Sequence, residues 1–242
     1  MLDALEQAAS SPLYNVLSKI AHGQLKNRSS GFQNSVVRAS TDWMYMWEEI
    51  QGASIIVELD WKKFDRERPA EDILFFIDVV ISCFFPQTSR EERLLSAYRI
   101  CMIKALIERP FISDGGLAFT MDGMVPSGSL WTGLLDTALN ILYIPSALLD
   151  MGFTSARAVP KCCGDDNLTL FYRDPGDTVL NGLRSRLNKF FRAGIDEEDF
   201  FIHRLPYYVM TDQTIFHAGT DLKRGTSKII DKARWEEFTG EI

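Results

Sequence analysis

The chain has 242 residues, 46% of them hydrophobic and 24% charged, which is the composition of a globular protein with one or two cores. Its formal net charge of −7 argues against a dedicated nucleic-acid binder, because phosphate contacts need clustered Lys and Arg, although a site for divalent metals must itself be acidic. No apolar run approaches about 18 residues and the N-terminus lacks the basic start of a signal sequence, so we expect neither a membrane span nor secretion.

The first part of the chain predicts helices around one buried strand. Helical patterns cover residues 1–22 and 41–50. The β-branched run "SIIVELD" at 54–60 predicts a strand that ends at Asp60. A largely buried helix follows, with Pro69 suited to its first turn.

The middle of the chain predicts a hairpin between two helices. Ser89 and Glu92 form a capping box for a helix that runs to about residue 109. The residues "DGG" at 114–116, between apolar segments, predict a hairpin. A long helix from about 129 to 150 is expected to end at Gly152 as its C-cap.

The last part predicts a second hairpin, "KCCGDDNLTLFY" at 161–172, with its turn at 164–167. A helix at about 177–193 is expected to close at Gly194. The hairpins favour an α+β fold over a parallel sheet. The four cysteines show no Cys-x-x-Cys spacing, so we expect free thiols in a reducing compartment. Further strands and a last helix are expected at 199–203, 206–210, 213–217 and about 231–238.

Two acids lie at the turn of the second hairpin and two more follow the strand at 54–60. Asp165 and Asp166 belong to "CCGDDN", and Asp65 comes five residues after Asp60. Acids at a turn are ordinarily solvated, and the spacing alone leaves that interpretation open. If the strand and the hairpin meet at one edge of a small antiparallel sheet, the carboxylates can instead hold divalent cations such as Mg²⁺. Two ions about 3.5–4 Å apart can stabilise both the attacking and the leaving oxygen of a phosphoryl transfer.

A third segment, "DGMVPSGSLWTGLLDTALN" at 122–140, places a flexible loop before a helix. Thr132, Asp136 and Asn140 recur every four residues and therefore share one helix face. Such a stripe of hydrogen-bonding groups can read a ribose hydroxyl, the feature that distinguishes RNA from DNA. The alternative is that Ser127 or Ser129 simply caps the helix.

The order Asp-x4-Asp, Ser-Gly-x3-Thr, Gly-Asp-Asp resembles that of the palm motifs of viral RNA-dependent RNA polymerases. The segments "DWKKFD", "GMVPSGSLWTGLLDTALN" and "CCGDDN" are similar to the polymerases of double-stranded RNA viruses of the partitivirus (cryptic virus) type. The resemblance covers the chain from about residue 25 onwards.

The resemblance implies a right-hand polymerase palm, an α+β fold with a three-stranded antiparallel sheet backed by helices. We expect partial fingers at 1–53, a palm at 54–218 with a fingers-like insertion at about 84–122, and the start of a thumb at 219–242. Only about 53 residues precede the first catalytic strand and the thumb is largely missing, so we expect a palm-centred fragment of a longer polymerase.

The resemblance also implies the catalytic residues. Asp60 and Asp165 are the main ligands of two Mg²⁺ or Mn²⁺ ions, and Asp166 assists them. The element after the hairpin often supplies a Lys as general acid for pyrophosphate in this family. Neither Lys189 nor His203 is a clear match, so that role stays unassigned.

The residues near the nucleotide are implied in the same way. Asp136 stands where many plus-strand virus polymerases carry Asn. It can accept a hydrogen bond from a 2′-hydroxyl or pair with Asp65 through a shared proton or water, and Asn140 is the alternative amide. The expected nucleotide and ribose contacts are Asp65, Ser127, Gly128, Thr132, Asp136 and Asn140.

The expected chemistry is attack of a primer 3′-hydroxyl on the α-phosphorus of a nucleoside triphosphate. The partners are then an RNA template and primer, nucleoside triphosphates and a viral capsid protein, in the host cytoplasm within the virus particle. Lys223, Arg224 and Lys228 are weak RNA-binding candidates, and a solvated basic stretch explains them equally well.

Three alternatives remain. The chain can be a truncated or host-integrated viral remnant that folds but does not polymerise. It can be another two-metal enzyme, such as a phosphohydrolase, which would not need the Ser-Gly-x3-Thr helix. Reverse transcriptases usually place an aromatic residue two before the paired acids, where this chain has Cys163, so RNA is the favoured product.

Overall fold

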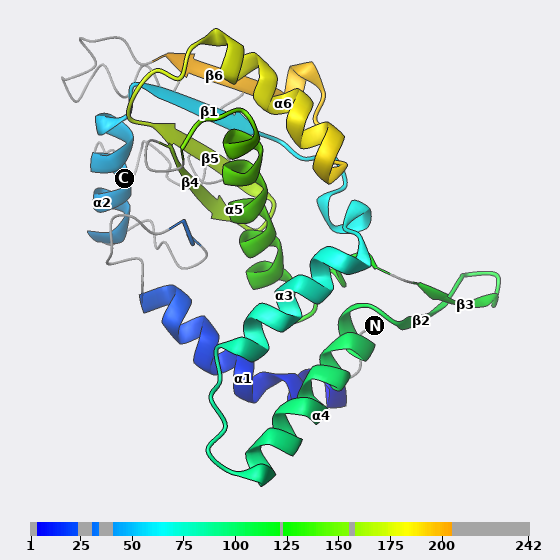
Figure 1. Cartoon of the computed structure of the whole chain (residues 1–242). Coiled ribbons are helices and arrows are strands. Elements are labelled where there is room, and N and C mark those ends of the chain that lie inside the picture. Colours follow the sequence, from blue (N-terminus) through cyan, green and yellow to red (C-terminus); the bar gives the residue numbers. More distant parts are fainter. Residues whose placement is uncertain (1–3, 24–30, 34–40, 122, 155–157, 205–242) are drawn as a thin grey trace, which may run out of the picture.

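The computed structural model describes residues 4–23, 31–33, 41–121, 123–154 and 158–204 (Figure 1). Several predicted features lie outside these residues. They are the strands at 206–210 and 213–217, the helix at 231–238, the start of the thumb at 219–242, and the basic residues Lys223, Arg224 and Lys228.

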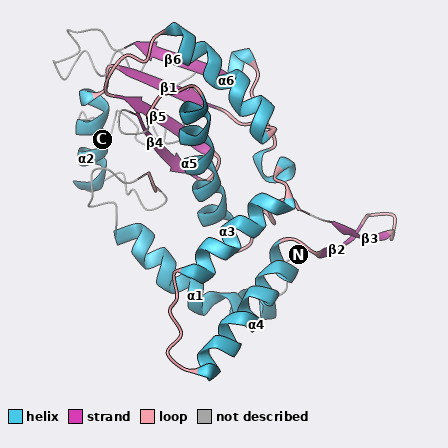
Figure 2. Ribbon diagram, in the orientation of Figure 1, coloured by secondary structure: helices cyan, strands magenta, loops and turns pink. Residues whose placement is uncertain are grey.

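An antiparallel sheet of four strands lies at one end of the molecule (Figures 1 and 2). The expected sheet of three strands has a fourth because β6 pairs along the whole of β1, from Ile55 opposite Arg204 to Leu59 opposite Phe200. In spatial order the strands are β4 (Ala158–Cys163), β5 (Asp166–Phe171), β1 (Ile55–Leu59) and β6 (Phe200–Arg204).

The two faces of the sheet pack against different cores, because successive strand residues point to opposite faces. In β1, Val57 and Leu59 belong to the larger core, which also contains residues of helices α5 (Thr132–Asp150) and α6 (Asp177–Phe191). Ile56 belongs to a smaller core with Met46 and Ile50 of helix α2 (Thr41–Gly52). Every residue of β1 is buried, so the strand is the centre of the fold.

Helix α5 is the core helix. It is long and apolar enough to cross a membrane by those two criteria alone, but 56% of that window is buried inside the protein. Its predicted end at Asp150 is confirmed, but the C-cap residue is Met151, and Gly152, with a φ of 75°, is the residue after it. Helix α6 ends differently from the prediction: Arg192, two residues before Gly194, takes the left-handed conformation at its C-cap.

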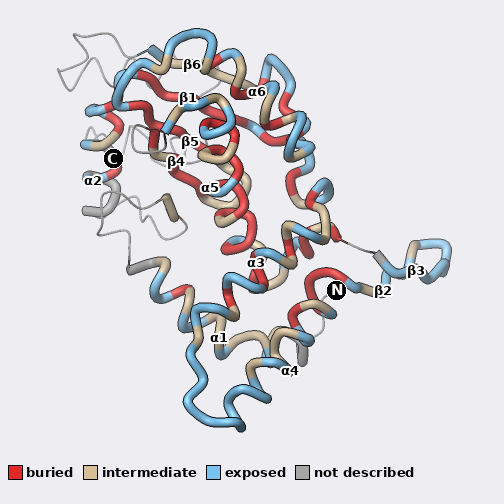
Figure 3. The backbone as a smooth tube through the Cα atoms, viewed as in Figure 1, coloured by how far each residue is buried: buried red, intermediate tan, exposed pale blue. Residues whose placement is uncertain are grey.

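The remaining helices form the other end of the molecule, and a hairpin projects from them. The capping box of α4 is formed by Thr88 and Glu91, so the prediction of Ser89 and Glu92 is wrong by one residue. The predicted hairpin is confirmed, and most of its residues are exposed (Figure 3). These elements are α1 (Ala4–Gly23), α3 (Ala70–Ser82), α4 (Ser89–Leu106), β2 (Arg109–Ile112) and β3 (Ala118–Met121).

The outer edge of β4 is partly covered by residues 31–33. The Gln33 N–H donates to the Cys162 carbonyl at 2.8 Å, and the Cys162 N–H donates to the Gly31 carbonyl at 2.8 Å. Pro160 lies two residues before Cys162 in the same strand, so its missing N–H falls on this outer side.

Candidate active site

The strand register brings two of the acidic motifs to one end of the sheet. Strands β1 and β5 are antiparallel, and their last registered pair is Leu59 opposite Asn167. Asp60 and Asp166 are the next residues in that register, and Asp165 lies in the turn just beyond. Acids that are more than 100 positions apart in the sequence therefore lie at the same sheet end, as the metal-site hypothesis requires.

The turn of the acidic hairpin is tighter than predicted. Only Gly164 and Asp165 form it, and Asp166 and Asn167 already belong to β5. Gly164 has a φ of 68°, a conformation that glycine adopts without a steric penalty and that suits two-residue hairpins. Asp166 is registered opposite Cys163, which packs against the smaller core.

Helix α5 holds this turn with neutral side chains. The Asn140 amide nitrogen lies 3.2 Å from the Gly164 carbonyl and 3.1 Å from the Asp165 carbonyl. The Thr137 hydroxyl accepts a hydrogen bond from the Gly164 N–H at 2.8 Å. Asn140 also accepts a 2.9 Å hydrogen bond from Asn167, which is itself buried. Helix α5 therefore fixes both the backbone of the turn and the neighbouring Asn167 side chain. Asp165, which lies in the turn, has a defined position as a result.

A second turn carries Asp65 toward the same helix. Asp65 belongs to the 3-10 helix η2 (Phe64–Glu67), and residues 60–63 separate this helix from the end of β1. The Asp65 carbonyl accepts from the Val125 N–H at 2.7 Å, and its carboxylate accepts from the Ser127 hydroxyl. Ser127 therefore does not cap the helix, whereas the Ser129 hydroxyl accepts from the N–H of the N-cap residue Trp131 at 3.3 Å.

The other loop residues support the same turn. The Thr132 hydroxyl donates to the Pro126 carbonyl at 2.7 Å, which anchors the loop to the first residue of α5. Gly128 has a φ of 95°, so a side chain at this position would be strained. Trp131 is buried, with its ring edge-on to Tyr14 of α1 at 5.4 Å between centroids.

Asp136 lies where the two turns meet. It is 4% exposed, and a side-chain hydrogen bond joins it to Asp65. Burial, followed by the negative charges of Asp65 and Asp165, raises the pKa of Asp136 to about 9, and Arg68 opposes this shift. Asp136 is therefore protonated at neutral pH and can donate to Asp65, as an Asn at this position would. Its Oδ1 is buried without a hydrogen-bond partner in the described part of the chain.

This arrangement suits hard divalent cations. Carboxylate oxygens are the ligands that Mg²⁺ prefers, and converging carboxylates that repel one another are stabilised when a cation joins them. The pKa of Asp136 is raised first by burial and then by the negative charges of Asp65 and Asp165, so repulsion between carboxylates is part of the shift. That Asp60, Asp165 and Asp166 hold the ions stays a prediction, because the close group of three carboxylates found among the described residues is a different one, Asp196, Glu198 and Asp199.

A further acidic group adjoins Asp60 and was not predicted. The carboxylate oxygens of Asp196, Glu198 and Asp199 all lie within 4.8 Å of one another. The Asp60 N–H donates to the Asp199 carbonyl at 3.0 Å, which connects this group to the end of β1. Lys62 forms ion pairs with both Asp196 and Asp199, so a lysine partly neutralises the group.

The basic residues that follow the acidic hairpin contact groups outside the acidic site. Lys189 is exposed on α6 beside the Phe190 ring. His203 lies on β6 with its Nε2 atom 3.4 Å from the buried Glu58 carboxylate. Arg204 forms ion pairs with Asp174 and with Asp177. The position of the general acid therefore stays unassigned among the described residues.

A small antiparallel sheet packed on helices, with acids from separated segments at one end, is the arrangement expected of a polymerase palm. A family model described as viral RNA-dependent RNA polymerase matches residues 16–181, more than half of the chain. The chain belongs to the viral RNA-dependent RNA polymerase family, whose members synthesise RNA on RNA templates and use divalent metals. No curated protein sequence matches the chain.

The sequence-based prediction of a viral RNA polymerase is thus confirmed at the level of the family, and the likeness to partitiviruses stays a prediction. Three residues of the site were missed: Thr137 and Asn167, which hold the hairpin turn, and Arg68, which lies behind the acids. Thr137 lies next to the predicted stripe, and Asn167 directly follows the paired acids. Their closeness in the sequence to predicted site residues could have identified both.

Proposed function

We propose that this chain is the palm region of a right-hand RNA polymerase that extends an RNA primer by a two-metal mechanism, in a double-stranded RNA virus of the partitivirus type. The observation that carries the proposal is the register of β1 and β5, which brings Asp60 to the sheet end that holds Asp165 and Asp166. The family match over residues 16–181 supports the same chemistry.

Asp60 and Asp165 are the proposed metal ligands, with Asp166 in a supporting role. When bound, the divalent ions activate the primer 3′-hydroxyl and neutralise the triphosphate as pyrophosphate leaves. The chain's own contribution is position, because misplaced reacting groups lose most of the rate. Asn140 supplies that position at the turn, where its amide meets the carbonyls of Gly164 and Asp165.

Asp65 and Asp136 are proposed to read the ribose. Ser127 holds one oxygen of Asp65, and the shared proton holds Asp136 against it. The Asp65 carboxylate is partly exposed and is then the acceptor that a ribose hydroxyl can reach, whereas the Oδ1 of Asp136 is fully buried. A 2′-hydroxyl that donates to Asp65 adds a hydrogen bond to a charged group, worth about 1.5–3 kcal/mol, which a deoxyribose cannot make.

The remaining parts of the proposal follow from the polymerase assignment. Family membership implies binding of RNA and nucleoside triphosphates. We place the chain with template and primer in the virus particle in the host cytoplasm, beside capsid protein. Lys223, Arg224 and Lys228 are retained as candidate RNA contacts.

Primer extension on an RNA template with Mg²⁺ or Mn²⁺ tests the function. Asp165→Asn removes one metal-binding charge while Asn140 still holds the backbone, so extension should fall roughly a thousandfold. The matched control is Asp150→Asn, which removes an exposed acid paired with Arg186 at the far end of α5 and should leave extension unchanged. Equal extension by the Asp165→Asn variant and the wild type would contradict the proposal.

A further inference from the structure

Arg68 is a buried cation beside an acidic site. It directly follows η2 and is 2% exposed, although a charged side chain is costly to remove from water unless it is compensated. Its Nε donates to the Phe64 carbonyl at 3.0 Å, and its Nη2 donates to the Arg192 carbonyl at 3.3 Å. The Nη1 atom is buried and makes no hydrogen bond with any described residue. The Arg68 side chain also has a hydrogen bond with that of Tyr143, whose hydroxyl donates to Asp72. These bonds satisfy only part of the buried guanidinium.

Aromatic rings surround the guanidinium. Its central carbon lies 4.4 Å from the centroid of the Phe64 ring and 5.2 Å from that of Tyr143. The Trp61 ring is at 5.9 Å. Ring faces attract cations, and a desolvated contact of this kind is worth about 2 kcal/mol. The rings therefore fix the guanidinium in place.

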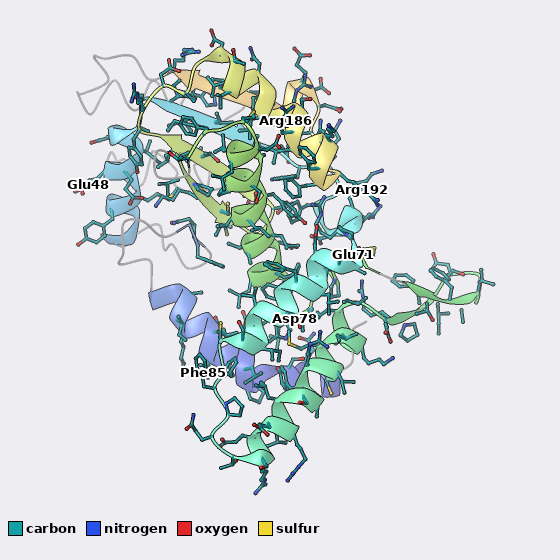
Figure 4. All side chains as sticks on the ribbon, in the orientation of Figure 1. Glu48, Glu71, Asp78, Phe85, Arg186 and Arg192 are labelled. Carbon is teal, nitrogen blue, oxygen red and sulfur yellow. The ribbon has the colours of Figure 1, made fainter. Side chains whose placement is uncertain are left out.

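Arg68 connects four segments of the fold. Its side chain reaches Tyr143 on α5 and the Arg192 carbonyl at the end of α6, which Figure 4 labels. Its own carbonyl accepts from the Met124 N–H at 3.0 Å, next to the pair formed by Val125 and Asp65. The Asp65 turn is therefore attached to both helices and to the loop before α5 through one residue.

The charge of Arg68 also acts on the site. It lowers the pKa of Asp136, whereas Asp65 and Asp165 raise it. These three residues are the charged groups that act on Asp136 from η2 and from the acidic hairpin. A fixed positive charge behind the carboxylates reduces their mutual repulsion, which matters most before any divalent ion is bound.

We propose that Arg68 is a positioning residue of the polymerase site: its buried guanidinium ties the Asp65 turn to helices α5 and α6 and supplies the fixed charge that lets Asp65, Asp136 and Asp165 lie together. Its effect on RNA synthesis rests on the proposed function, but its effect on the acids does not. Arg68 acts through Asp65 and Asp136 and does not touch the substrate.

The test compares Arg68→Met, Arg68→Lys and the control Arg186→Met in the full chain. Arg186, which Figure 4 labels, also connects α5 and α6, through an ion pair with Asp150, but that pair lies at the last residue of α5, whereas Asp136 lies in its first turns. Near-ultraviolet circular dichroism reports whether each variant folds. Carbon-13 NMR of the Asp136 carboxyl, without divalent ions, reports its titration, and primer extension reports kcat and KM.

Arg68→Met should raise the pKa of Asp136 by about one unit or more and lower kcat about tenfold. Arg68→Lys keeps the charge but loses the planar fork, so it should restore the Asp136 titration and only part of kcat. Arg186→Met should change neither. An unchanged Asp136 titration in a folded Arg68→Met variant would overturn the proposal, as would failure of both Arg68 variants to fold, which would make the residue structural only. If the wild type extends no primer, the proposed function fails while the titration still decides the role of Arg68.

Discussion

The hairpin turn with Asp165 and the turn with Asp65 both face helix α5, but different forces hold them. The first is held by neutral groups, the Asn140 amide and the Thr137 hydroxyl. The second has neutral backbone bonds too, such as that from the Val125 N–H, but the Asp65 carboxylate itself is held by a serine hydroxyl and by a proton shared with Asp136. The geometry of Asp165 should therefore be insensitive to pH, whereas the geometry of the Asp65 carboxylate should depend on it.

The substitution Asp136→Asn removes the pH-dependent contact of the Asp65 turn and should have the largest effect. The pKa of Asp136 is raised to about 9, above its unfolded value, so its protonation stabilises the fold fully below about pH 4 and this contribution is lost as pH rises toward 9. Asn donates to Asp65 at every pH. The stability of the variant relative to the wild type should therefore grow by up to about 1.4 kcal/mol per pH unit, or about 4 kcal/mol from pH 5 to pH 8.

Urea unfolding at several pH values in EDTA measures this difference in the free energy of unfolding between the variant and the wild type. A suitable control is Asp114→Asn, because Asp114 is an exposed residue of the projecting hairpin and its substitution should leave the pH profile parallel to that of the wild type. A constant gap between the Asp136→Asn variant and the wild type across the range would show that no proton is shared.

Asn140→Leu tests the neutral side of the comparison. Leucine has a similar size but leaves the Gly164 and Asp165 carbonyls and the buried Asn167 without their partner. The free energy of unfolding should fall by about 3 kcal/mol, with the same loss at pH 5 and pH 8. Chemical denaturation checks this value against Asn181→Leu, an exposed position on α6. A loss that changed with pH would remove the distinction between the two turns.

Ser127→Ala should have the smallest effect. It removes the hydroxyl that donates to the Asp65 carboxylate but leaves Thr132 and its bond to the Pro126 carbonyl in place. A hydrogen bond to a charged group contributes about 1.5–3 kcal/mol, and water replaces part of it here, so KM for nucleotide should rise about tenfold with kcat nearly unchanged. Steady-state primer extension measures both constants, and Ser113→Ala in the exposed hairpin is the control. A fall in kcat alone would assign Ser127 to the chemical step.

The sequence predicted the order of the elements well, because each depends on local patterns. The run before Asp60 and the glycine after α5 are strong local signals, and both are confirmed. The exact hairpin turn was wrong because Gly, Asp, Asp and Asn all tolerate turns, and only the docking of Asn167 under Asn140 places that residue in the strand. Local propensity does not contain that contact.

The burial of Arg68 is a second feature that could not be predicted from the sequence. The charged segment "DRERP" around Arg68 is typical of a protein surface. In the structure, however, Arg68 is buried against the aromatic rings of residues 61, 64 and 143. Two of these rings are local and the third comes from a helix far along the chain. Its burial follows from tertiary packing, which no spacing rule describes. Asp136 is similar: its place in the stripe was predictable, but its raised pKa depends on burial and on two carboxylates from other segments.

Pro160 has a consequence for the whole molecule in solution. The four-stranded sheet has two edges, β4 and β6. At the β4 edge, residues 31–33 already bond to Cys162, and Pro160 offers no donor to an incoming strand. The β4 side of the molecule therefore resists edge-to-edge self-association.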